Sequence, residues 1–93
     1  MGEEAKIEKK LKRWAKDNNC LTYKFSSPAN RGVPDRIFIG PGGKVLFLEL
    51  KAPGEKPTAL QNKRIAEIVD QGGQATWTDD AELGKFLIKK FCL

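Results

Sequence analysis

Residues 44–51 read Lys-Val-Leu-Phe-Leu-Glu-Leu-Lys and have the strongest strand pattern in the chain. Neighbouring side chains in a strand point to opposite faces, so the three leucines share one face. The other face carries two apolar residues followed by a carboxylate and an ammonium: Val45, Phe47, Glu49 and Lys51. Charged groups in an apolar strand usually pair with each other or bind a metal ion. The strand alone favours neither an edge salt bridge nor a metal site.

A second strand, residues 35–39, precedes this one and is joined to it by the turn Gly40-Pro41-Gly42-Gly43. Hairpin pairing sets the start of the second strand beside the end of the third, so Asp35 is expected beside Glu49. Adjacent carboxylates repel, and a divalent cation that prefers oxygen ligands, Mg²⁺ or Mn²⁺, relieves the repulsion. The alternative is that Asp35 only shapes the turn after Pro34.

The rest of the chain alternates between helical and strand patterns. In chain order we expect a helix over residues 3–17, a strand over 20–25, the hairpin, a helix over 59–71, a strand over 74–78 and a helix over 80–91. Thr58 and Gln61 form a capping-box pattern for the second helix, and Asp79 is expected to cap the last. The order α-β-β-β-α-β-α predicts an α/β fold with helices packed on a sheet, in one domain of 93 residues.

Composition limits the chemistry. The chain has 17 Lys and Arg against 12 Asp and Glu, a net charge of +5 that favours polyanionic partners, and it contains no histidine. Histidine-based triads, histidine phosphodiester chemistry and histidine-ligated zinc are therefore excluded. Cys20 and Cys92 have no metal-ligand spacing and suggest reduced thiols in a cytoplasmic compartment. No signal-peptide pattern is present, and no apolar run approaches the roughly 20 residues of a membrane span.

Two polar side chains fall on the apolar stripes of the predicted helices. Glu4 lies in the stripe of Ile7 and Leu11, with Glu8 at its edge, so Glu4 is a candidate site residue. The alternative is that acidic residues simply favour a helix's first turn. Gln61 lies in the stripe of Ile65, Ile68 and Val69 of the second helix. Its capping role explains it without function, and a place near the active site is the alternative.

The loop between the first two strands is flanked by cations, and Lys24, Arg31 and Arg36 are candidates for binding DNA phosphates. As isolated basic residues, they are equally compatible with ordinary solvated surface.

Pro34-Asp35 followed by Glu49-Leu50-Lys51 matches the PD-(D/E)XK nuclease signature. The wider pattern resembles the VRR-NUC (virus-type replication-repair nuclease) family over nearly the whole chain. That pattern comprises Glu4-x-x-Ile7, Lys24-Phe25-x-Ser27-Pro28, Gly32-Val33-Pro34-Asp35-Arg36, Gly42-Gly43, Glu49-x-Lys51-Ala52-Pro53-Gly54, Gln61 and Gly72. The resemblance implies a restriction-endonuclease-like core, a mixed sheet flanked by helices, and metal-dependent hydrolysis of DNA phosphodiesters.

The resemblance also implies roles for particular residues. Asp35 and Glu49 would hold Mg²⁺ or Mn²⁺ with the backbone carbonyl of Leu50, and Lys51 would orient or help to deprotonate the attacking water. The family's helical acid maps to Glu4 as a further metal ligand, with Glu8 as the fallback. The family's helix glutamine maps to Gln61, as a catalytic residue.

Stand-alone members of the family, common in phages and bacteria, resemble Holliday-junction resolvases that cut as dimers. A homodimer acting on branched or four-way DNA is therefore expected, inside the host cell. The last helix carries more apolar residues than one buried face needs and either contributes to the dimer interface or belongs to the core: Leu83, Phe86, Leu87, Ile88 and Phe91. Two other functions remain open, a catalytically silent nucleic-acid-binding module and a small interaction domain with a salt-bridged strand. Metal-dependent cleavage of DNA separates the nuclease from both.

Overall fold

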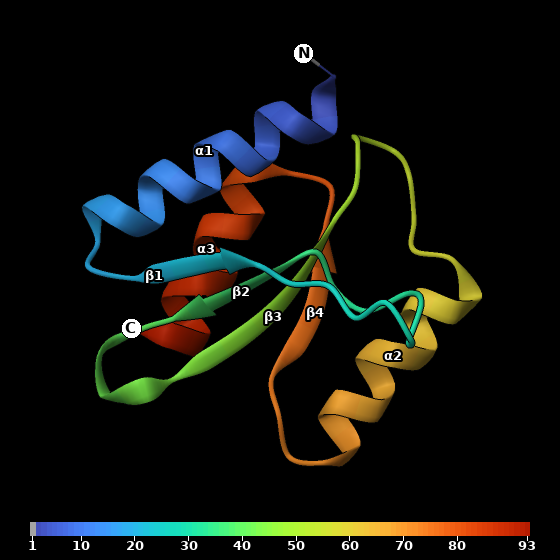
Figure 1. The fold of residues 1–93 in the computed structure, drawn as a ribbon. Coiled ribbons are helices and arrows are strands. Elements are labelled where there is room, and N and C mark those ends of the chain that lie inside the picture. Colours follow the sequence, from blue (N-terminus) through green and yellow to red (C-terminus); the bar gives the residue numbers. More distant parts are fainter. Residues whose placement is uncertain (1) are drawn as a thin grey trace.

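The helices and strands follow the predicted order (Figure 1). A computed structural model describes residues 2–93. Its elements are α1 (Glu3–Asp17), β1 (Leu21–Lys24), β2 (Arg36–Ile39), β3 (Val45–Leu50), α2 (Ala59–Asp70), β4 (Ala75–Thr78) and α3 (Ala81–Cys92). A single 3₁₀ turn, Pro41–Gly43, connects β2 to β3. The α/β class is therefore confirmed, and no helix within residues 2–93 is long and apolar enough to cross a membrane.

The strands form a mixed sheet in the order β1-β2-β3-β4. The first three strands are antiparallel neighbours, and β4 lies parallel to β3. In the β2–β3 ladder Arg36 pairs with Leu48, so one step further along Asp35 lies opposite Glu49. In the β3–β4 ladder Leu50 pairs with Thr78. The hairpin register expected from the sequence is thus confirmed, and it sets the two carboxylates at one end of the sheet.

The hydrophobic core lies between the sheet and the pair α1 and α3. The leucines of β3 and Phe38 of β2 are buried there against Ile7, Leu11 and Ile88. Figure 1 shows α1 and α3 together on this side of the strands. The leucine face expected from strand alternation is therefore the core face, and Glu49 projects from the opposite face.

The opposite face of the sheet is only partly covered. Helix α2 lies beside β4 and contains no fully buried residue. Ile65 and Ile68 are half-buried, whereas Val69 is 49% exposed, so the apolar stripe of α2 does not enter a core as its spacing suggested. Leu21 and Tyr23 of β1 are each 57% exposed on the uncovered part of the sheet. The sheet thus leaves an apolar surface on the side that carries Glu49.

The helix caps correct one expectation. Thr58 caps α2 in a capping box with Gln61, as predicted. Helix α3 begins one residue later than expected, and its cap is Asp80, whose carboxylate accepts a hydrogen bond from the Leu83 backbone N–H at 2.8 Å. Asp79 instead accepts from the Gly54 backbone N–H at 2.9 Å and closes the loop after β3. The Asp79 prediction was wrong because neighbouring aspartates fit the capping pattern equally well.

Candidate active site

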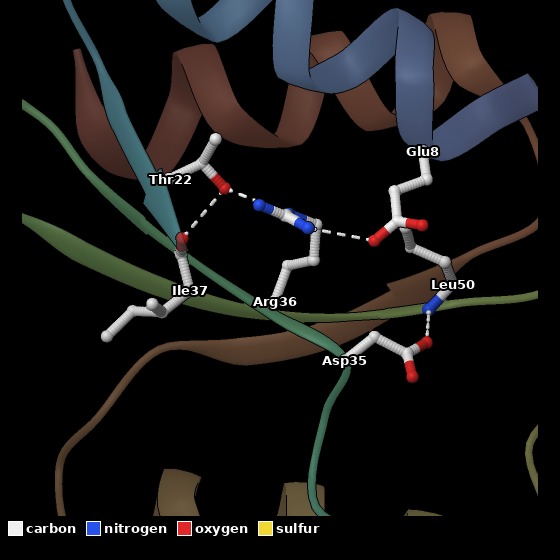
Figure 2. A network of polar contacts seen from close by, with 6 residues as sticks. All are labelled: Glu8, Thr22, Asp35, Arg36, Ile37 and Leu50. Atoms are coloured by element: carbon white, nitrogen blue, oxygen red, sulfur yellow. Dashed lines mark hydrogen bonds and ion pairs between the residues drawn. The ribbon is translucent and has the colours of Figure 1, made fainter. Parts of the chain in front are cut away.

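Asp35 and Glu49 lie opposite each other where β2 and β3 meet the helix N-termini. Asp35 directly follows Pro34, and its Oδ2 accepts a hydrogen bond from the Leu50 backbone N–H at 2.9 Å (Figure 2). This bond ties the side chain of the residue just before β2 to the backbone of the last residue of β3. One Asp35 oxygen is therefore fixed against β3, which orients the carboxylate toward the end of that strand.

Glu49 is a buried carboxylate with an incomplete set of partners. Its side chain is 3% exposed, its Oε2 accepts from Gln61 Nε2 at 3.1 Å, and the same oxygen lies 3.5 Å from Lys51 Nζ. Its other oxygen, Oε1, is buried and has no hydrogen-bond partner among residues 2–93. Burying a carboxylate oxygen without a hydrogen-bond partner costs free energy. A ligand that is not part of the protein would supply the missing partner.

The surroundings of Glu49 disfavour its ionised form in the absence of a cation. Burial and then the neighbouring Asp35 charge raise the pKa of Glu49 from 4.5 to about 7, against the opposing effect of Lys51. The Glu49–Lys51 ion pair considered from the strand pattern does form, yet it does not compensate the carboxylate. Two carboxylates beside one lysine leave a site that an added positive charge would stabilise.

Gln61 caps α2 and also contacts Glu49. Its Oε1 accepts from the Thr58 backbone N–H at 2.9 Å, which completes the capping box. Its Nε2 donates to Glu49 at 3.1 Å. Because the capping box fixes the orientation of the Gln61 amide, its N–H group points at Glu49 Oε2. Glu49 Oε1 has no partner among residues 2–93.

Helix α1 brings its first two turns to the same end of the sheet. Glu4 and Glu8 line a small pocket of about 40 Å³ together with Lys24, Asp35 and Leu50. Burial and then the Asp35 charge raise the pKa of Glu4, so the two carboxylates are close enough to repel. Glu8 is instead ion-paired: its Oε2 lies 2.9 Å from Arg36 Nη1. Of the two acids considered, only Glu8 is held in an ion pair among residues 2–93, whereas Glu4 lies near Asp35 with Lys51 partly offsetting the repulsion.

The three predicted DNA-contacting cations occupy different environments. Lys24 and Arg31 are exposed, and Lys24 lines the pocket beside Asp35. Arg36 is 6% exposed and its guanidinium is bonded to Glu8 and Thr22. Such burial leaves Arg36 no free face for a phosphate, so its sequence-based assignment to DNA contact needs correction. Strand alternation was the overlooked signal, because Arg36 shares the core-facing side of β2 with Phe38.

A divalent metal ion fits the residues at this end of the sheet. The orphaned Glu49 oxygen and the adjacent Asp35 carboxylate provide hard oxygen donors of the kind that Mg²⁺ and Mn²⁺ prefer. No group of three or more Cys, Asp or Glu side chains within residues 2–93 is arranged to hold a metal. Glu4 is therefore not gathered with Asp35 and Glu49 into one side-chain ligand set, and it lines the neighbouring pocket instead.

Known proteins resemble this chain along most of its length. A protein of Acyrthosiphon pisum secondary endosymbiont phage 1, described as "Putative nuclease p44", is 43% identical over 84 residues, which are 90% of each chain. A solved VRR-NUC domain superposes with a TM-score of 0.86 at 23% identity, covering 96% of this chain and 97% of that one. A second VRR-NUC domain protein gives a TM-score of 0.75 at 20% identity, covering 95% of this chain and 86% of that one. No protein-family profile matches the sequence. With a relative that is 43% identical along nearly its whole length, the chain belongs to the same nuclease family as this phage protein, and it has the fold of VRR-NUC domains.

Proposed function

We propose that this chain is an endonuclease that hydrolyses DNA phosphodiester bonds with Mg²⁺ or Mn²⁺, and that residues 1–93 act as a single nuclease domain. The observation that carries the proposal is the buried, unpartnered Oε1 of Glu49 opposite Asp35. Asp35, Glu49 and the Leu50 carbonyl would hold the ion, with Glu4 contributing from the neighbouring pocket. When bound, such an ion lowers the pKa of a coordinated water and neutralises charge on a scissile phosphate.

The remaining residues have roles that follow from their contacts. Gln61 holds Glu49 Oε2 and so leaves Oε1 as the oxygen that would bind the ion. The Lys51 ammonium, half-buried at 3.5 Å from Glu49, can donate a hydrogen bond to an attacking water or a phosphate oxygen. Exposed Lys24 and Arg31 supply charge for flanking phosphates.

A catalytically silent nucleic-acid-binding module is the competing function. The Asp35 and Glu49 carboxylates would repel a bound phosphate. A module that only binds nucleic acid would also have no use for a buried carboxylate whose ionised form is disfavoured. Asp35→Ala, Glu49→Ala and Lys51→Ala should each abolish cleavage while circular dichroism shows folded protein. Exposed Glu82→Ala, on α3, is the matched control and should cleave like the parent. Parental cleavage by the Asp35 or Glu49 variant would refute the assignment.

We further propose that the substrate is branched DNA, such as a four-way junction, and that the enzyme acts as a homodimer in the cytoplasm of a bacterial host. The phage relative supports the host setting. Exposed apolar surface supports self-association: Leu83 and Phe86 of α3 are 45% and 58% exposed, whereas Ile88 is buried. A two-fold dimer would supply two sites for the two symmetric nicks that resolve a junction.

Sedimentation beside a cleavage panel tests this finer proposal. Linear duplex, flap, splayed and four-way substrates would be compared at one salt concentration, because phosphate contacts make binding strongly salt-dependent. We expect a dimer at micromolar concentration and fastest cleavage of the four-way junction. A monomer that cuts linear duplex as fast as a junction would remove the resolvase assignment and leave the nuclease assignment intact.

A further inference from the structure

A buried arginine connects α1 to the sheet directly beside the candidate site. Arg36 Nη1 donates to Glu8 Oε2 at 2.9 Å, and its Nε donates to Thr22 Oγ1 at 3.1 Å (Figure 2). The Thr22 hydroxyl in turn donates to the Ile37 carbonyl at 3.0 Å. With two nitrogens of its planar guanidinium fixed by different elements, Arg36 can hold Glu8 in only a narrow range of positions.

The anchored residue lies one helical turn from Glu4. Residues four apart on a helix share a face, and Glu4 and Glu8 both line the pocket that contains Asp35. Arg36 is the first residue of β2 and immediately follows Asp35, and the two side chains point to opposite sides of the backbone. Two consecutive residues at the start of β2 therefore carry the site carboxylate and the cation that fixes the helix.

The start of α1 has few polar contacts besides this anchor. Its N-cap is Gly2, which makes no side-chain capping hydrogen bond. The first-turn ion pair Glu3–Lys6 is exposed, with side chains 62% and 55% accessible, and such pairs contribute little. Ile7 packs this turn against the core, and the Glu8–Arg36 ion pair adds the polar contact that fixes its position beside Asp35.

We propose that Arg36 is a positioning residue that acts through Glu8 to hold Glu4 facing Asp35. The inference rests on the proposed metal-dependent function, in which a carboxylate at that place strengthens binding of the ion. Arg36 and Glu8 touch neither the ion nor the substrate in this account. Their effect on the site depends entirely on Glu4.

Mn²⁺ binding by the folded full-length chain, measured by calorimetry at fixed pH and salt, tests the proposal without relying on cleavage. Glu8→Ala should weaken Mn²⁺ binding about 10-fold, as loss of an outer partner typically does. Glu3→Ala removes an exposed ion pair from the same helix and should leave binding unchanged. Glu4→Gln should weaken binding, and adding Glu8→Ala to that variant should weaken it no further.

Arg36→Lys is the second, milder variant, since lysine keeps the buried charge but cannot bridge Thr22 and Glu8 with a planar fork. Circular dichroism would establish that each variant is folded at the assay temperature. We expect Arg36→Lys to weaken Mn²⁺ binding in the parent and not in the Glu4→Gln background. Equal weakening in both backgrounds, or none in either, would overturn the positioning role. Failure of the parent to bind Mn²⁺, or binding that survives Asp35→Ala, would overturn the proposed function and this inference with it.

Discussion

Replacing Glu49 by glutamine should stabilise the metal-free protein at alkaline pH and remove its stabilisation by metal. Glutamine has nearly the same shape, and its carbonyl oxygen can still accept the hydrogen bond from Gln61. The substitution removes a buried charge that lies opposite Asp35 and has only one of its oxygens partnered. The folded protein therefore loses a repulsion that the unfolded chain does not have.

The size of the effect follows from the pKa of Glu49. A carboxyl whose pKa rises from 4.5 to about 7 on folding binds its proton more tightly in the folded state. The parent protein should thus be most stable, with respect to this group, below pH 4.5 and should lose stability as the pH rises to about 7. At 1.36 kcal/mol per pKa unit, the loss is on the order of 3 kcal/mol. Losing the Lys51 ion pair offsets part of the gain in the glutamine variant, which leaves roughly 2 kcal/mol, or about 10 °C in melting temperature, at pH 8.

Thermal unfolding of the parent and of Glu49→Gln would be followed at pH 5 and pH 8, with a chelator or with excess Mn²⁺. Without metal, the variant should melt higher at pH 8, and its advantage should nearly vanish at pH 5. Mn²⁺ should raise the melting temperature of the parent at pH 8 and leave that of the variant unchanged. A variant that melts no higher than the parent at pH 8, or that gains as much from Mn²⁺, would refute the reasoning.

Three further outcomes follow from individual contacts. Mn²⁺ affinity should fall up to about 10-fold per pH unit below pH 7, because the ion must displace the proton that Glu49 holds below its pKa. An Mn²⁺ affinity that does not change between pH 5 and pH 8 would contradict this prediction. Gly40→Ala should destabilise the fold by about 2 kcal/mol, because an added Cβ would lie 1.9 Å from the Cys92 carbonyl oxygen. Gly2→Ala is the control, because a Cβ there meets nothing within 4 Å. Equal urea midpoints for the two variants would argue against this packing. Lys24→Ala and Arg31→Ala should each reduce the slope of log DNA affinity against log salt by about 1. Lys44→Ala, in the distant β2–β3 turn, is the control and should leave the slope unchanged. Unchanged slopes for the Lys24 and Arg31 variants would exclude phosphate contacts at these residues.

The opposition of Asp35 and Glu49 was predictable because it depends on local geometry. The turn after Gly40 restricts the hairpin register, and register together with strand alternation determines which side chains are neighbours. Gln61 was foreseeable for the same reason, since its capping pattern and its place in a helical stripe are both properties of a few consecutive residues. In such segments, sequence spacing translates directly into position.

The role of Arg36 was not predicted, because it depends on how α1 crosses the sheet. Alternation could have placed Arg36 on the core side with Phe38, yet nothing in the sequence identifies Glu8 and Thr22 as its partners across separate elements. The coverage of α2 was misjudged for a related reason. The spacing of apolar residues in α2 indicates which face of the helix packs against the sheet. The spacing does not indicate how much of that face the sheet covers.

Cleavage of DNA as a function of divalent metal tests the central claim most directly. Purified chain would be incubated with a labelled four-way junction and a linear duplex in excess chelator, and then with Mg²⁺ or Mn²⁺ restored. Asp35→Ala would be carried through the same series as a folded, inactive control. We predict no cleavage in chelator, cleavage by the parent when either metal is restored, and none by the variant. Equal cleavage with and without chelator, or restored cleavage by Asp35→Ala, would contradict a metal-dependent site built on Asp35 and Glu49.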